Sequence, residues 1–237
     1  MVSIYLEEID STNSYLKRNY KLIEDGTFVY TDYQSAGKGR SGRNWQSEKG
    51  NNLLFSLLIK NEKLLEKYKE LSVVSALSVI QVLQKYQISN LGLKWPNDVY
   101  VDGKKIAGIL LEGVSTDKLE CLIIGIGINV NQSVFENDLK IPAQSVRNCL
   151  DREIDLAKFR KEIFSNISDN LNKLTDGYDF YNEVIQYDYL KGKRVSAVIA
   201  GEKKIVTVNG INRDYSLAVT SDDGDKNLES GEISFHL

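Results

Sequence analysis

Histidine is almost missing from this chain of 237 residues, since the only one is His236, next to the C-terminal residue. A Ser-His-Asp triad and an H-E-x-x-H zinc site both need histidine at the reacting centre, so both are excluded. The two cysteines, Cys121 and Cys149, are too few and too far apart to indicate a disulfide framework or a zinc site. Any chemistry must therefore depend on lysine, arginine, backbone amides or a metal held by carboxylates.

Long apolar runs are missing as well. No segment approaches the roughly 20 apolar residues that span a bilayer, and the start, MVSIYLEEIDSTN, lacks the basic region and apolar core of a secretion signal. The net charge of −3 and the pI near 5.4 leave no basic footprint for general nucleic-acid binding. The composition, 42% hydrophobic and 27% charged, is typical of a soluble globular protein. We expect cytoplasmic residence, with neither DNA nor a membrane as partner.

The apolar pattern predicts alternating strands and helices over most of the chain. Short alternating or continuous apolar runs predict strands, and near-helical apolar spacing predicts helices. The predicted strands are 2–8, 28–33, 53–60, 91–95, 99–101, 104–112 and 120–130. The predicted helices are a short one ending near 20 and two long ones, 62–86 and 155–174. Asp102 and Gly103 predict a two-residue hairpin turn.

The last part of the chain, 191–237, has a different character. Short alternating segments, RVSAVIA, KKIVTVNGI, YSLAVT and EISFHL, are separated by turn residues, which is typical of a small β-barrel. The aromatic and polar stretch 176–190 is expected to bridge the two parts. We therefore predict two domains, residues 1–187 and residues 188–237.

A basic, glycine-rich segment, QSAGKGRSGRNW, follows the second predicted strand at 34–45. Its glycines allow amide N–H groups to turn toward an anion, and its cations can clamp the same anion. No helical apolar pattern follows, so the dinucleotide turn that opens into a helix is excluded. The alternatives are a flexible surface loop and a mobile phosphate-binding loop, and we favour the second. Trp45 is either a packing anchor or an aromatic lid over a base.

Two polar segments admit both a local and a functional interpretation. Residues 11–13, Ser-Thr-Asn, suit a helix N-cap, and their hydroxyls and the helix amides also suit a polar group of a small ligand. These two interpretations are compatible. Asn97 and Asp98, in the segment KWPND, are either a plain turn or an amide and a carboxylate that help to hold a metal bound to phosphates.

Lys105 is predicted to share a strand face with the apolar Ala107 and Ile109, because alternate residues of a strand point to the same side. It is then either an ordinary surface lysine or an amine that projects into a pocket. Gly108 lacks a side chain, which allows a ligand to approach the sheet closely.

The segment GIGIN at 125–129 places Gly125 and Gly127 inside an apolar strand. Such glycines indicate either a bulge or a ligand that approaches the backbone. Asn129, at the end of this strand, is predicted to join Asn97 and Asp98 around a metal–phosphate group.

In this order, the four segments resemble the biotin protein ligases. The family patterns S-T-N, Q-x-A-G-R-G-R-x-G-R-x-W, K-W-P-N-D with K-[LI]-A-G-I-L, and G-[IA]-G-I-N are similar to 11–13, 34–45, 94–98 with 105–110, and 125–129. The ending SGEIS at 230–234 is similar to the end of the family's C-terminal barrel.

Two departures from the family pattern matter. Lys38 stands where the family usually has arginine, which keeps the charge but loses the bidentate fork. The chain begins only ten residues before Ser11, so the N-terminal winged-helix DNA-binding domain of many bacterial relatives is expected to be absent.

The resemblance implies an α+β fold, in which a mixed sheet with helices mainly on one face, as in class II synthetases, precedes a small SH3-like barrel. It implies a ligase that uses ATP and Mg²⁺ to make biotinyl-5′-AMP and then biotinylates a lysine of a biotin carboxyl carrier protein, with no repressor role. Relatives are both monomers and dimers, so a homodimer stays open. The rivals are a lipoate–protein ligase and a non-catalytic nucleotide-binding protein.

The resemblance also assigns roles to single residues. Lys105 and Arg40 are expected to be catalytic, and Asp98 is expected to face Mg²⁺. The residues expected to bind biotin are Ser11, Thr12, Asn13, Gln34, Gly37, Lys38, Gly39, Arg40, Lys105, Gly108, Gly125 and Gly127. The residues expected to bind ATP or the adenylate are Lys38, Arg40, Arg43, Trp45, Asn97, Lys105 and Asn129.

Overall fold

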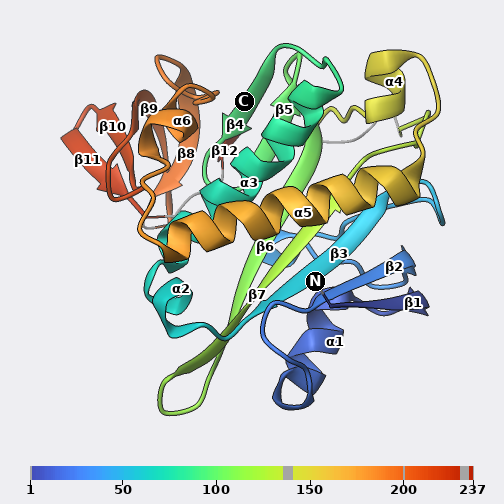
Figure 1. Cartoon of the computed structure of the whole chain (residues 1–237). Coiled ribbons are helices and arrows are strands. Elements are labelled where there is room, and N and C mark those ends of the chain that lie inside the picture. The colour runs from blue at the N-terminus through green and yellow to red at the C-terminus, as the bar shows by residue number, and fades with distance from the viewer. Residues whose placement is uncertain (1, 136–140, 200, 230–234, 237) are drawn as a thin grey trace.

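The computed structural model describes residues 2–135, 141–199, 201–229 and 235–236, which form two β-sheets and their covering helices (Figure 1). The segment 230–234, which carries the resemblance at the C-terminal end, lies outside the described residues. The first sheet is mixed and has seven strands, and the second is antiparallel and has five. The predicted α+β fold is confirmed.

The seven-stranded sheet has the order β1-β2-β3-β7-β6-β5-β4. Its first pair, β1 and β2, is parallel, and all its other pairs are antiparallel. The strands are β1 (Ser3–Ile9), β2 (Phe28–Gln34), β3 (Leu53–Ile59), β4 (Leu91–Lys94), β5 (Asp98–Val101), β6 (Lys104–Ser115) and β7 (Leu119–Ile128). The predicted hairpin is confirmed, because Asp102 and Gly103 both adopt the positive φ of a type I′ turn between β5 and β6.

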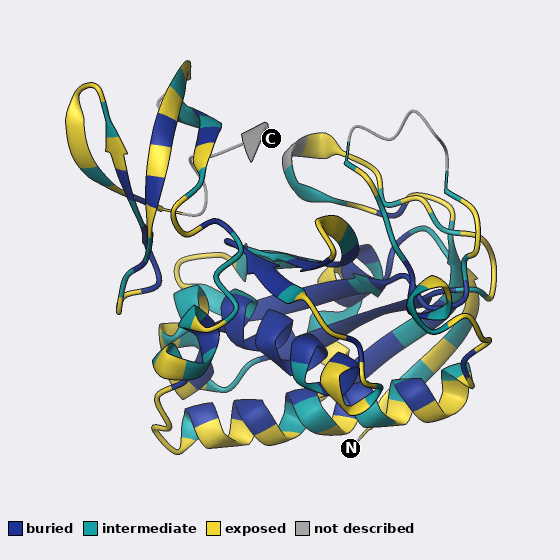
Figure 2. Cartoon of the chain, turned by 90° about the horizontal axis from the view of Figure 1, so that it is seen from above, coloured by how far each residue is buried: buried dark blue, intermediate teal, exposed yellow. Residues whose placement is uncertain are grey.

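Two long helices, α3 (Tyr68–Lys85) and α5 (Leu156–Thr175), pack against each other and bury the main core on one sheet face. The short α1 (Thr12–Asn19) packs on the opposite face through a second, smaller cluster that includes Leu16 and Leu58. Figure 2 shows the strands of this sheet mostly buried and α5 with one exposed side. Among the described residues, no helix is both long and apolar enough to cross a bilayer.

The prediction of one continuous helix over 62–86 is wrong at Lys67. Lys67, with φ −95° and ψ 26°, leaves the helical conformation and separates α2 (Glu62–Glu66) from α3. The apolar spacing continues across this break, so periodicity alone does not reveal it. The helical segments that the sequence did not predict are η1 (Tyr20–Leu22), η2 (Arg40–Gly42), α4 (Val146–Leu150) and α6 (Tyr181–Ile185).

The C-terminal sheet has the order β11-β10-β9-β8-β12. Its strands are β8 (Arg194–Ile199), β9 (Glu202–Ile211), β10 (Leu217–Ser221), β11 (Gly224–Leu228) and β12 (Phe235–His236). Within the described residues no pairing joins β11 to β12. The indole N–H of Trp95 donates to the carbonyl of Tyr215 at 2.8 Å, and this bond ties the C-terminal sheet to the turn after β4.

Candidate functional site

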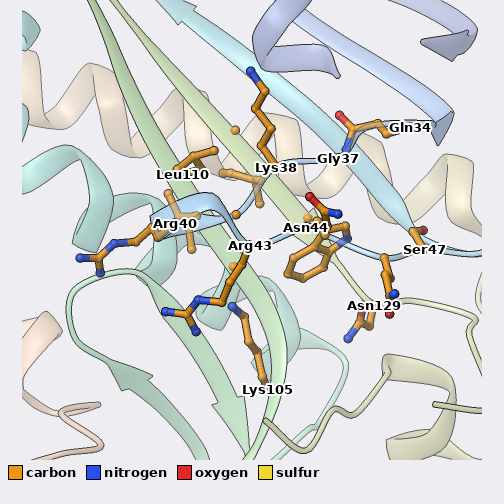
Figure 3. Close-up of a pocket in the computed structure, with 18 of the residues that line it drawn as sticks. Gln34, Gly37, Lys38, Arg40, Arg43, Asn44, Ser47, Lys105, Leu110 and Asn129 are labelled. Carbon is orange, nitrogen blue, oxygen red and sulfur yellow. The ribbon is translucent and has the colours of Figure 1, made fainter. Parts of the chain in front are cut away.

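A cavity of about 770 Å³ opens on the sheet face that carries α1, and its size is that of a small-molecule site (Figure 3). All residues for which the sequence predicted a role line it. These are Ser11, Thr12, Asn13, Gln34, Gly37, Lys38, Gly39, Arg40, Arg43, Trp45, Asn97, Asp98, Lys105, Gly108, Gly125, Gly127 and Asn129. The structure thus brings the four sequence segments together, while the role of each residue stays a prediction.

The floor of the cavity consists of paired residues from neighbouring strands, whose side chains point to the same sheet face. One row crosses four strands, from β4 to β7: Lys94, Asp98, Gly108 and Gly127. The adjacent row crosses β6, β7 and β3: Leu110, Gly125 and Ser56. The register is continuous through both rows of β6 and β7, so the bulge interpretation of the GIGIN glycines is wrong.

Gly108 and Gly127 make room for the indole ring of Trp45. A Cβ atom on Gly127 would lie 2.5 Å from Cε2 of Trp45, and one on Gly108 would lie 3.0 Å from Cζ3. Any larger side chain at Gly127 would displace the ring. The close approach to the sheet that the glycines predicted is therefore made by a side chain of the protein itself, and Trp45 packs on the floor of the cavity.

Gly125 makes room for Asn13, because the side-chain amide of Asn13 occupies the space that a Cβ atom on residue 125 would need. The hydroxyl of Ser56 lies within hydrogen-bond distance of the side-chain oxygens of Thr12 and Asn13. Asn13 also donates to the carboxylate of Glu112 at 2.8 Å. This buried network holds the start of α1 against the sheet.

Residues 11–13 form both the helix cap and part of the cavity wall, so the cap is confirmed and ligand binding by these residues stays a prediction. The Ser11 hydroxyl accepts from the backbone N–H of Ser14 as the N-cap of α1. Thr12 donates its backbone N–H and its hydroxyl to Oε1 of Gln34, at 2.8 and 3.0 Å. These two bonds fix the side-chain oxygen of Gln34 at the end of β2.

Lys105 lies on the cavity face, and an irregularity in β6 puts it there, since regular alternation of side chains back from Gly108 would place it on the opposite face. The pairing between β5 and β6 skips Ile106, which forms a β-bulge. The bulge puts both Ile106 and Ala107 in the core and leaves the amine of Lys105 beside Gly108. The prediction that Lys105 shares a face with Ala107 and Ile109 is wrong, because the extra residue reverses the alternation between them.

The amine of Lys105 forms an ion pair with Asp98 at 2.7 Å and lies 5.4 Å from the ring centroid of Trp45. Asp98 is therefore engaged by a cation in this structure. No group of three or more metal-ligating His, Cys, Asp or Glu side chains occurs among the described residues. This donor set does not fit a metal held by the protein alone; it fits only an ion that arrives with phosphate oxygens as its main ligands.

The basic loop brings two of its three cations together over the floor. Figure 3 shows Arg40 and Arg43 on the side of the cavity where Lys105 lies, while Lys38 points the other way. Arg40 donates to the side-chain oxygen of Asn97 at 2.9 Å, and burial lowers the pKa of its guanidinium. Lys38 does not join this cluster, contrary to the prediction that all three cations close over one anion.

The loop is closed on itself by backbone hydrogen bonds. Gly39 donates to Arg43 and Trp45 donates to Gly37, at 2.7 and 3.0 Å, and Lys38 bridges to Asn44. These bonds present Arg40 and Arg43 on one short arch.

Asn97 and Asn129 have different hydrogen-bond partners. Asn97 donates its side-chain amide to the carbonyl of Ile109, whereas the backbone N–H of Asn129 donates to Ile106, three residues earlier on β6. The side-chain amide of Asn129 donates to the carbonyl of Gln144 at 3.1 Å. Asn97, Asp98 and Asn129 all line the cavity, and that Asn129 joins the other two around one ion stays a prediction.

Sequence reasoning missed two residues of the site. Ser56 is fully buried at the floor, and its signal is a single hydroxyl in the apolar strand LLFSLLI. Lys94 is 6% exposed and lines the cavity, and it was noticed only as the first letter of KWPND. Among the described lining residues, five cations face two carboxylates: Lys38, Arg40, Arg43, Lys94 and Lys105, against Glu48 and Asp98. The cavity therefore favours an anionic ligand.

Comparison with known proteins agrees with this geometry. The sequence model of the biotin/lipoate A/B protein ligase family matches residues 5–129. The bifunctional ligase/repressor BirA of Escherichia coli is 32% identical over 237 aligned residues, which cover 97% of this chain and 72% of that protein. The BirA proteins of two Bacillus species align over 49% and 42% of their length, so the chain spans about half or less of those relatives.

Among solved structures, the biotin protein ligase of Aquifex aeolicus in complex with biotin and ATP is similar to this chain. The two are 31% identical with a TM-score of 0.87, over 99% of this chain and 98% of the other. The aligned part of this chain therefore includes both sheets. The family match, the near-complete alignment and the shared fold show that this chain belongs to the biotin/lipoate A/B protein ligase family.

Proposed function

We propose that this chain is an ATP-dependent biotin–protein ligase, which forms biotinyl-5′-AMP and transfers the biotinyl group to a lysine of a biotin carboxyl carrier protein. The observation that carries the proposal is the convergence of the four sequence segments on one cation-rich cavity. It is supported by the similarity to the Aquifex aeolicus structure, which contains biotin and ATP.

In the first half-reaction, an oxygen of the biotin carboxylate attacks the α-phosphorus of ATP, and pyrophosphate leaves. Two anions must approach each other, so the site has to neutralise charge and align the reactants. Lys105 is placed to do this, because its amine lies on the floor beside Gly108 and its ion pair with Asp98 is open to exchange for ligand oxygens. Arg40 and Arg43 approach from the loop above.

The uncharged part of biotin is assigned to the other end of the cavity. There Thr12, Gln34 and Asn13 form a buried hydrogen-bonding wall held by Ser56. The remaining donor capacity of the Gln34 amide suits the polar ureido group or the carboxylate of biotin. Trp45 and the apolar side chain of Leu110 supply walls for the aliphatic part.

In the second half-reaction, a lysine amine of the carrier attacks the acyl carbon, and AMP leaves with the electron pair of the broken acyl–phosphate bond. The mixed anhydride is already activated, so this chain mainly has to hold it in place and exclude water. The arch of Arg40 and Arg43 covers the phosphate, and Trp45 lies beneath it. Mg²⁺ enters this proposal with the nucleotide as part of the substrate, and Asp98 is the carboxylate that faces it.

The proposal places the reaction in residues 1–187, with residues 188–237 as a C-terminal unit, and in the cytoplasm. It includes neither a repressor role nor a DNA partner, and it is compatible with a monomer or a homodimer.

One incubation tests this function. The purified protein with ATP, Mg²⁺ and labelled biotin is expected to produce biotinyl-AMP and, after addition of a carrier domain, a biotinylated lysine. Labelled lipoate in place of biotin should give no adenylate. An adenylate formed only with lipoate would make the chain a lipoate ligase, and ATP binding without either adenylate would contradict a ligase function.

A further inference from the structure

Lys94, at the end of β4, is a buried cation that the proposed mechanism has not used. Its side chain is 6% exposed and lines the cavity. The nearby carboxylate, Asp98, is paired with Lys105 instead. In the described part of the chain, no carboxylate lies within 4 Å of the Lys94 amine, and burial lowers the pKa of that amine. Burying an amine without a counter-charge costs free energy, so an anionic ligand would stabilise it.

Aromatic rings hold this amine in position. The Lys94 amine lies 3.2 Å from the hydroxyl of Tyr100 and 5.1 Å from the centroid of its ring. The Tyr100 ring stacks on Tyr189 at 4.9 Å, and the amine of Lys193 lies 3.1 Å from the centroid of Tyr189. Tyr189 also packs on Gly92, the residue of β4 that points to the same face as Lys94. Lys94 is thus fixed from the side of the C-terminal unit.

The position of Lys94 in the sheet indicates which part of a nucleotide it meets. It pairs with Asp98, which pairs with Gly108, so it lies at the outer end of the row whose inner end is covered by Trp45. Lys105 already lies beside Asp98, where the carboxylate and the α-phosphate are proposed to react. An amine one strand further out lies where the remaining phosphates extend.

We propose that Lys94 is a further catalytic residue, which binds the β- and γ-phosphates of ATP and stabilises the pyrophosphate that leaves. This inference rests on the proposed adenylation reaction. A bond forms between the biotin carboxylate oxygen and the α-phosphorus, and the bond from that phosphorus to the bridging oxygen breaks. The electron pair stays on pyrophosphate, and the ammonium group of Lys94 donates a hydrogen bond to the oxygen atoms that gain charge.

The test separates the two half-reactions in a Lys94→Met variant, which keeps the length and apolar stem of the side chain. Biotin-dependent ATP–pyrophosphate exchange is expected to fall by about 10²–10³-fold, the effect of removing one preorganised donor. Transfer from preformed biotinyl-AMP to the carrier should stay within about twofold of wild type, since no pyrophosphate is present in that step. Lys104→Met is the matched control, because Lys104 is an exposed lysine at the start of β6, in the same sheet.

A second variant tests the positioning by Tyr100. Tyr100→Phe keeps the ring stack and removes only the hydroxyl, so exchange should fall by about 2–10-fold, with transfer again unchanged. Thermal unfolding of both variants reports on folding, and Lys94→Met should be no less stable than wild type, because it removes a buried unpaired charge.

Normal exchange in a folded Lys94→Met protein would overturn the inference, as would an equal loss in exchange and in transfer. Both results are distinct from a failure of the proposed function, in which the wild-type protein itself forms no biotinyl-AMP.

Discussion

At the residue scale, the shape of the site depends on positions where one added atom would exclude a neighbouring side chain. Glycine at 125 and 127 admits Asn13 and Trp45, and the hydroxyl of Ser56 joins Thr12 to Asn13. These residues determine the shape of the wall, whereas Lys105 and Arg40 supply its charge. Charge and shape are therefore open to separate tests.

Replacement of Lys105 by alanine is expected to reduce adenylate formation by about 10²–10³-fold, because one charge-assisted contact of the transition state is lost. Pyrophosphate release in the presence of biotin measures the effect, and circular dichroism checks the fold. Lys104→Ala is the control on the exposed side of the hairpin. Near-normal pyrophosphate release from a folded Lys105→Ala protein would remove Lys105 from the catalytic residues.

Replacement of Gly127 by alanine should displace Trp45, because the new Cβ would lie 2.5 Å from the ring. We expect altered tryptophan emission and weaker binding of biotinyl-AMP, measured by fluorescence and by equilibrium dialysis. Gly113→Ala is the matched control, since its Cβ would meet only the ends of the Leu119 and Leu122 side chains, at 3.1 and 3.7 Å. If Gly127→Ala has the tryptophan emission and the biotinyl-AMP affinity of the wild type, the position of the Trp45 ring does not depend on this glycine.

At the scale of single elements, local sequence was a good guide to most strands and a poor one to irregularities. The runs that form β1, β2 and β3 were predicted within one or two residues, because continuous or alternating apolar runs between polar stretches are distinctive. The break at Lys67 and the bulge at Ile106 were not predicted, because the apolar spacing continues across the first and the second places two successive apolar residues, Ile106 and Ala107, in the core. The site residues were found largely because the resemblance supplied their combination.

The basic loop should be mobile without ligand and ordered by the adenylate. Its glycines make ordering costly in entropy, and a ligand that orders the loop is retained by it. Arg40→Gly removes the bond to Asn97 and, under the proposed function, a phosphate contact, so it should speed release of biotinyl-AMP more than it slows adenylation.

Released adenylate acylates lysines of bystander proteins, which a biotin blot detects. Limited proteolysis of the loop with and without biotin plus ATP is the companion measurement. Equal retention of adenylate by Arg40→Gly and wild type, or proteolysis unaffected by ligand, would contradict this gating model.

The ion pair of Asp10, just before α1, with Arg18 is expected to stabilise the protein less at acid pH. Arg18, in the last turn of α1, donates two hydrogen bonds to Asp10, at 2.6 and 2.9 Å, which lowers the pKa of that carboxyl to about 2. A carboxyl whose pKa is lower in the folded state stabilises the protein above its unfolded pKa and loses this effect as pH falls toward 2. The effect is small, because the pair is half exposed.

Urea unfolding of wild type and Asp10→Asn should therefore differ slightly at pH 6 and converge as the pH falls from about 4 to about 2. A difference that stays constant over this range would show that the ion pair is not its cause.

At the scale of the whole molecule, the two sheets are joined by specific contacts as well as by the chain. Trp95 donates to Tyr215, Lys69 pairs with Glu229 at 2.8 Å, and the backbone N–H of Tyr189 donates to Leu93 of β4 at 3.0 Å. The sequence predicted the small β-unit from its alternation. It did not predict how that unit is held, because such contacts combine residues far apart in the sequence.

The purified protein should not bind operator DNA specifically. The net charge is −3, and the cations that converge in the cavity lie on its floor and on the loop above it, not on an exposed helix suited to a groove. A gel-shift assay with a biotin-gene promoter fragment at several salt concentrations checks this. Sequence-specific, salt-sensitive retardation would contradict it.

The extra residue in β6 has a consequence for how this sequence can diverge. Exchange of Ile106 for another apolar residue leaves the amine of Lys105 over the cavity. Loss of the bulge with the length of β6 unchanged would restore regular alternation and turn that amine into the core beneath α3. The direction of the amine therefore depends on the bulge and not on which apolar side chain residue 106 carries, and we expect relatives that have this bulge to tolerate apolar substitutions at 106.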